Sequence, residues 1–199
     1  MASRDEARAK LYDAAERQAG YFTSAQARAA GYSHALQHYH HKVGNWRKER
    51  WGLYRLARFP STPGEDLVRL MLWSRDRSGR TRAVVSHESA LQAYELSDVL
   101  PAKVHLTVPK AFRKRPPSDV VLHRGDVPAE DVRERDGVLV TTPLRTLLDV
   151  AASPSSPEHL EDAARAALGR GLVRRDALER ALRDAPETVR ARFERVGVA

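Results

Sequence analysis

The chain has 199 residues, of which 42% are hydrophobic and 30% charged, the composition of a folded protein with room for one large or two small domains. It contains no cysteine, which excludes disulfides, thiolate zinc sites and cysteine nucleophiles. Its N-terminus lacks a signal-peptide stretch, and no apolar run approaches the ~20 residues of a membrane helix, so we expect a cytoplasmic protein that does not contact a membrane.

The net charge of +8 is concentrated near the N-terminus. Residues 1–60 contain 11 Lys/Arg against 5 Asp/Glu, a net charge of +6, whereas residues 61–152 and 153–199 each carry only +1. A localised basic segment is typical of proteins that bind a polyanion. The charge pattern therefore predicts a nucleic-acid-binding segment within the first 60 residues.

Three helices and a hairpin are predicted in this basic segment. Ser3 and Thr23 begin capping-box patterns at the starts of the first two helices. The second helix ends at Gly31, and Ser33 caps a third helix after a turn of only three residues, the spacing of a helix-turn-helix. The next segment, NWRKERWGLYRLAR, predicts a hairpin with a charged tip at residues 47–50. Together these elements predict a winged helix.

The pattern changes after residues 58–64, which we interpret as a linker. Short strands and amphipathic helices then alternate, and two or three Ala/Leu/Arg-rich helices follow a second linker candidate at 153–157. The expected fold class is α+β, with a winged helix-turn-helix in residues 1–60 and a mixed α/β domain in residues 61–199 that has a helical tail from about 157. The elements expected in the second domain are helices at 62–75 and after Ser86, strands at 83–85, 103–109, 120–124 and 137–142, and a helix opening at Thr142-Pro143.

The third helix, SHALQHYHHK (33–42), contains four of the eight histidines. On a helix, Leu36, Tyr39 and Val43 share one stripe, so we expect the opposite face to point outward. Gln and neutral His can bond base edges, and the basic hairpin can contact phosphates. The predicted DNA-contacting residues are therefore Ser33, His34, Gln37, His38, His41, Lys42, Arg47, Lys48 and Arg50.

Two other interpretations of the histidines stay open. His34 and His38 are four residues apart and could share a metal ion, but residues 24–48 contain no carboxylate, so we expect no metal. A polar surface helix without a partner is the second alternative.

Catalysis is a third hypothesis, for the second domain. Six polar residues there could form an acid–base or nucleophile set, yet each has a structural explanation such as capping a helix, so we expect neither an enzyme nor a cofactor. The six residues are Ser86, His87, Glu88, His105, His123 and Asp149.

A basic run, Arg113, Lys114 and Arg115, precedes two prolines. We interpret it as a solvated loop that could also extend the DNA surface or touch a partner.

The segment YFTSAQARAAGYSHALQHYHHKVGNWRKERWGLYRLARFP (21–60) resembles the N-terminal winged helix of the AbiEi antitoxin family. The segments VVSHESALQAYELSDVLPAKVHLTVPK (84–110) and VLHRGDVPAEDVRERDGVLVTTPLRTLLDVA (121–151) are similar to the domain that follows it in that family. The resemblance covers roughly residues 5 to 180.

The resemblance implies a bacterial antitoxin of a type IV toxin–antitoxin, or abortive infection, system that acts in phage defence. Such a protein represses its own operon by binding repeats in double-stranded promoter DNA. It also counteracts a nucleotidyltransferase-like toxin, in many accounts without a stable complex. Binding as a homodimer on inverted repeats is left open, as are two alternative functions: a toxin-neutralising protein without specific DNA binding, and a general winged-helix regulator.

Overall fold

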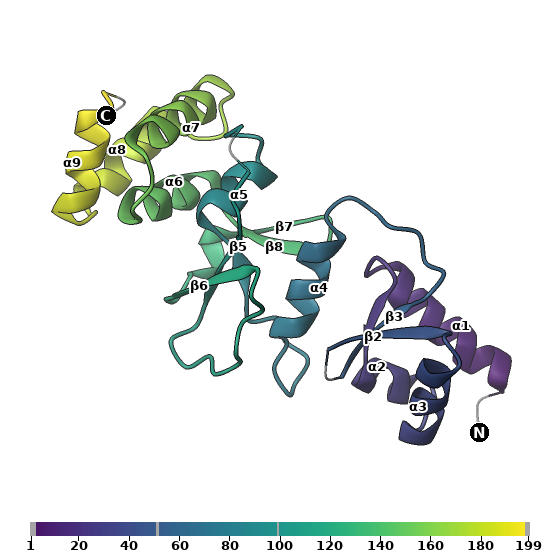
Figure 1. Ribbon diagram of the computed structural model, residues 1–199. Coiled ribbons are helices and arrows are strands. Elements are labelled where there is room, and N and C mark those ends of the chain that lie inside the picture. Colours follow the sequence, from purple (N-terminus) through teal and green to yellow (C-terminus); the bar gives the residue numbers. More distant parts are fainter. Residues whose placement is uncertain (1–2, 51, 99, 198–199) are drawn as a thin grey trace. The chain divides into compact units, whose positions relative to one another are not determined.

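The computed structural model describes residues 3–50, 52–98 and 100–197 (Figure 1). It divides into two compact units, Met1–Thr81 and Arg82–Ala199. Helices and strands occur in both, so the α+β fold class is confirmed.

The first unit is a winged helix followed by one further helix. A three-stranded antiparallel sheet in the order β1-β3-β2 packs with three helices, and β2 and β3 form the expected hairpin. The elements are α1 (Arg4–Glu16), β1 (Tyr21–Thr23), α2 (Ser24–Ala29), α3 (His34–Lys42), β2 (Trp46–Arg50), β3 (Leu53–Leu56) and α4 (Glu65–Ser74).

Capping residues begin these helices where the sequence predicts. The Ser3 side chain accepts from the backbone N–H of Glu6. At α2 the capping box is complete, because Thr23 and Gln26 exchange side-chain and backbone hydrogen bonds. Each such cap satisfies backbone N–H groups that the first turn of a helix leaves unpaired.

The core of the first unit lies between the helices and the sheet. It contains Leu11, Phe22, Ala27 and Trp46, all buried. The rings of Phe22 and Trp46 meet edge to face with centroids 4.8 Å apart. Trp46, the first residue of the wing, therefore joins the hairpin to the helices.

Helix α4 belongs to this first unit, so the unit ends at Thr81 and not at residue 60. Leu72 of α4 packs against Tyr21 and Leu53. Arg55, only 1% exposed, donates to Glu65 at 2.7 Å and to the Pro60 carbonyl at 3.1 Å. These contacts hold residues 58–64 in place, so this segment connects two parts of one unit.

The second unit is a five-stranded mixed sheet covered by helices. Its strand order is β6-β5-β4-β8-β7, in which β4–β8 and β5–β6 are parallel and the other two pairs antiparallel. The elements are β4 (Val84–Val85), α5 (His87–Ala93), β5 (Val104–Val108), β6 (Val120–Arg124), η1 (Ala129–Asp131), β7 (Val132–Arg135), β8 (Val138–Thr141), α6 (Pro143–Ala152), α7 (Pro157–Gly169), α8 (Arg175–Arg183) and α9 (Glu187–Arg195).

Buried apolar side chains occur in the sheet and in the helices of this unit. Leu106 and Val140 of the sheet are buried, as is Leu147 of α6. Leu160 and Phe193 are buried in the C-terminal helices. The expected linker at 153–157 is also held in place, because the Arg192 guanidinium of α9 donates to three of the carbonyls of residues 151–155.

Within the described part of the chain, no helix has the length and apolar character needed to span a membrane.

Candidate nucleic-acid interface

Helices α2 and α3 form a tight helix-turn-helix. Gly31 lies between them with a φ of 110°, a left-handed value that glycine adopts without steric penalty. The Tyr32 amide donates to the Ala27 carbonyl at 2.9 Å, which closes the end of α2. The Ser33 hydroxyl then accepts from the Leu36 amide and starts α3.

The inward side of α3 is polar, contrary to the sequence prediction. Gln37 is 2% exposed, and its Oε1 accepts from the Ser24 hydroxyl at 2.6 Å. Its Nε2 donates to the Tyr32 carbonyl at 2.9 Å and more weakly to the Ser24 carbonyl at 3.4 Å. The prediction that Gln37 contacts DNA is wrong, because its amide is buried and bonded between α2 and α3.

The apolar stripe expected to face the core is exposed instead. Leu36, Tyr39 and Val43 are 44%, 55% and 48% exposed. With about 3.6 residues per turn, Tyr39 lies almost opposite Gln37 on the helix, with Lys42 beside it. The stripe faces outward because the Gln37 amide and the His40 imidazole occupy the inward side of α3.

The four histidines of α3 divide into two pairs. His40 stacks on the Trp46 ring with centroids 4.8 Å apart, and burial lowers the pKa of its imidazole. His41 is exposed, but its Nδ1 lies 3.3 Å from the Trp46 carbonyl oxygen, to which it donates. His34 and His38 are exposed. Two of the four therefore join α3 to the wing, and two are placed on the surface.

The wing carries the basic side chains that the sequence predicts for phosphate contacts. Arg47, Lys48 and Arg50 are all exposed on β2. The register with β3 shifts between Lys48 and Arg50, which marks a bulge near the tip. The expected tip residues thus lie within a strand, in which Glu49 separates Lys48 from Arg50.

One cation of the basic segment has a structural role. Arg55 is buried against Glu65, and its guanidinium stabilises the junction with α4. It cannot reach DNA, so the charge available at the surface is smaller than the count along the sequence suggests.

A polar cluster in the second unit brings together most of the residues considered for catalysis. His105 Nδ1 lies 2.9 Å from Glu88 Oε2 and 3.1 Å from His123 Nε2. The His87 ring stacks face to face on His123 with centroids 3.5 Å apart. Ser86, which is 0% exposed, accepts from the Thr107 hydroxyl at 2.8 Å.

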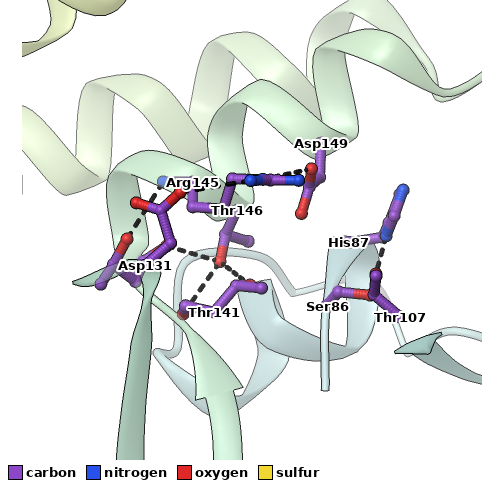
Figure 2. A network of polar contacts seen from close by, with 9 residues as sticks. Ser86, His87, Thr107, Asp131, Thr141, Arg145, Thr146 and Asp149 are labelled. Atoms are coloured by element: carbon purple, nitrogen blue, oxygen red, sulfur yellow. Dashed lines mark hydrogen bonds and ion pairs between the residues drawn. The ribbon is translucent and has the colours of Figure 1, made fainter. Parts of the chain in front are cut away.

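Figure 2 shows Ser86 between Thr107 and His87, with the Ser86 hydroxyl 2.9 Å from His87 Nδ1. Burial lowers the pKa of His87 to about 3, and hydrogen bonding to His105 lowers the pKa of Glu88 to about 2. His87 is therefore neutral at physiological pH. A fully buried hydroxyl with two bonded neighbours is a structural group that a substrate cannot reach.

Asp149 bonds to Arg145 and not to the residues of this cluster. Figure 2 shows Arg145 between two carboxylates: its Nε donates to Asp149 at 2.8 Å and its Nη1 to Asp131 at 3.2 Å. This bridge ties α6 to the end of η1. Burial raises the pKa of the Asp149 carboxyl.

Among the described residues, no group of three or more His, Asp or Glu side chains could hold a metal ion.

The basic run at Arg113, Lys114 and Arg115 lies in the exposed loop between β5 and β6. Its role as part of a DNA or partner surface stays a prediction.

Comparison with known proteins identifies the family to which the chain belongs. A profile of the AbiEi antitoxin C-terminal domain matches residues 81–196, which is almost the whole second unit. No curated protein matches the sequence. Among solved structures, the chain is similar to the RV2827C protein from Mycobacterium tuberculosis, with a TM-score of 0.59 at 17% identity over 96% of this chain and 75% of that one. At this identity the likeness shows a shared fold. Because the profile spans more than half of the 199 residues, the chain belongs to the AbiEi antitoxin family and is an antitoxin of a toxin–antitoxin system.

Proposed function

We propose that this antitoxin also binds DNA, represses transcription of its own operon in the bacterial cytoplasm, and counteracts a nucleotidyltransferase-like toxin without catalysis, metal or cofactor. The single observation that carries the DNA-binding part is the pairing of an exposed helix α3 with a basic wing on a winged-helix unit. In helix-turn-helix proteins the second helix of the motif enters the major groove.

The contacts divide between the two elements. Arg47, Lys48 and Arg50 of β2 are suited to phosphates, since long cationic side chains on a wing reach the backbone without reading sequence. On α3, the exposed side chains of His34, His38 and Lys42 and the Ser33 hydroxyl are suited to base edges and adjacent phosphates. His41 contributes through its Nε2, because its Nδ1 is bonded to the wing.

Toxin neutralisation is assigned to the second unit, because the family match lies in residues 81–196. The two activities should therefore separate in the intact chain. A variant with Arg47→Ala, Lys48→Ala and Arg50→Ala is expected to lose promoter binding and to keep its protection of cells against the cognate toxin.

The test uses two assays on the same variants. A gel shift compares the promoter upstream of this gene with an unrelated fragment of equal length, and a growth assay co-expresses the toxin from the neighbouring reading frame. Loss of both activities in the triple variant, with an unchanged free energy of unfolding, would refute the division between the units.

A second candidate function is toxin neutralisation without specific DNA binding. The observation that favours it is that the family match begins at residue 81 and leaves the winged helix outside. A protein of this kind would protect cells from the toxin and would bind promoter and unrelated DNA with equal affinity.

A further inference from the structure

The outward face of α3 is apolar at its centre. Leu36 and Tyr39 are 44% and 55% exposed, and Ala35 is exposed beside them. Single exposed apolar side chains are ordinary, but several on one helix face mark a contact surface. Val43 continues the stripe, yet it also borders a cavity of about 610 Å³ together with Trp46. Leu36, Tyr39 and Ala35 therefore form the apolar face proper.

The surroundings of this face specify an anionic partner. Lys42 is exposed at the end of α3, and β2 adds three exposed cations, Arg47, Lys48 and Arg50, against one exposed carboxylate, Glu49. Residues 24–48 contain no carboxylate. A partner that is anionic at its edges and apolar at its centre fits both properties.

The major groove of DNA has this character where it contains thymine. Phosphates line its two edges, and the thymine 5-methyl group is the apolar feature that it presents to a protein. Small and aromatic side chains on recognition helices contact that methyl group. The chemistry of α3 thus matches a groove rich in A·T pairs with thymine methyl groups pointing at the helix.

We propose that Ala35, Leu36 and Tyr39 read thymine 5-methyl groups in the promoter, an inference that rests on the proposed DNA-binding function. Specificity then comes mainly from apolar contacts, with the histidines at the flanks of the helix in a secondary role. The binding site should accordingly contain thymines opposite α3.

The probe is the promoter fragment amplified with deoxyuridine in place of thymidine, which removes the methyl groups and keeps every hydrogen-bonding group of the bases. Burial of one methyl-sized group contributes ~0.8 kcal/mol, or about fourfold in affinity. Loss of one or two contacts should weaken binding of the intact chain by about 4- to 16-fold. The dependence of affinity on salt should not change, because phosphate contacts are the same.

Leu36→Ala serves as the matched variant, because leucine and alanine both favour helices and the site is exposed. It should bind the thymidine fragment more weakly than the parent does and show a smaller difference between the two fragments. Any effect of deoxyuridine on DNA shape would persist in this variant. Leu100→Ala, at a site 75% exposed in the second unit, should retain the full difference.

Equal affinity of the parent chain for both fragments would overturn the inference and leave the proposed function standing. So would an equal loss on both fragments in Leu36→Ala, which would indicate that this face joins two copies of the chain. Failure of the parent chain to shift the unmodified promoter would overturn the proposed function itself.

Discussion

The replacement of Gln37 by alanine tests the orientation of α3. The substitution removes an acceptor for the Ser24 hydroxyl and a donor to the Tyr32 carbonyl, both in a site that is 2% exposed. A buried polar group that loses its partner costs about 1–3 kcal/mol, and the deleted side-chain volume adds to this. We expect the free energy of unfolding of the first unit to fall by about 2–4 kcal/mol.

Tryptophan fluorescence during urea denaturation measures this change selectively, because all three tryptophans, at positions 46, 51 and 73, belong to the first unit. Gln37→Met keeps the volume without the hydrogen bonds and should fall between the parent and the alanine variant. His38→Ala, at the adjacent exposed position, should stay within about 0.5 kcal/mol of the parent.

The DNA-binding behaviour of the same variant distinguishes the two orientations. A buried Gln37 predicts that affinities for promoter and unrelated DNA decline together as folded protein is lost. An unchanged stability with a selective loss of promoter affinity would refute the reasoning and return Gln37 to the base-reading face.

Three further predictions concern pH, charge and metal. Acidification from about pH 7.5 to about pH 5 should destabilise the second unit by about 2 kcal/mol. The pKa of His87 is about 3 when folded and 6.5 when unfolded, so over this range the unfolded state takes up a proton that the folded state does not. Calorimetry that shows a constant stability across this range would indicate that the cluster is solvated. Arg47→Ala should lower the slope of log affinity against log salt by about one per bound chain. A slope that stays at the parent value would remove Arg47 from the DNA contacts. Arg55→Ala should instead destabilise the first unit by about 3 kcal/mol, because Glu65 loses its partner. EDTA should leave promoter binding unchanged, and a loss that zinc reverses would indicate a metal site at the exposed histidines of α3.

Local signals in the sequence were sufficient for most of the fold. Helix caps at Ser3, Thr23 and Ser33 are short-range patterns, and the structure forms all three. Strand β7 was not predicted because three of its four residues, Arg133, Glu134 and Arg135, are charged and exposed. Strand β1 has only three residues and exists through pairing with β3. A sequence pattern contains no information about such a partner.

The orientation of α3 could not be predicted from the sequence pattern for a related reason. In a helix of nine residues, an apolar stripe at Leu36, Tyr39 and Val43 fits burial in the core and contact with a partner equally well. The deciding contacts are those of Gln37 with Ser24 and Tyr32, which depend on how α2 and α3 pack.

Long-range pairing also explains the other differences. Arg55 and Glu65 extend the first unit past residue 60, although each residue alone is typical of a surface. The histidine cluster assembles because the parallel pairing of β5 and β6 places Thr107 opposite His123, next to His105. Their separation along the chain gives no sign of this proximity.

Transcription from the promoter of this gene tests the central claim most directly. A reporter fused to that promoter is measured with the intact chain supplied from a second plasmid, and with the Arg47→Ala, Lys48→Ala, Arg50→Ala variant at the same protein level. DNA binding through α3 and the wing predicts that the parent chain lowers reporter expression and that the variant does not. Reporter expression that is the same with the parent chain, with the variant and without either would contradict the claim.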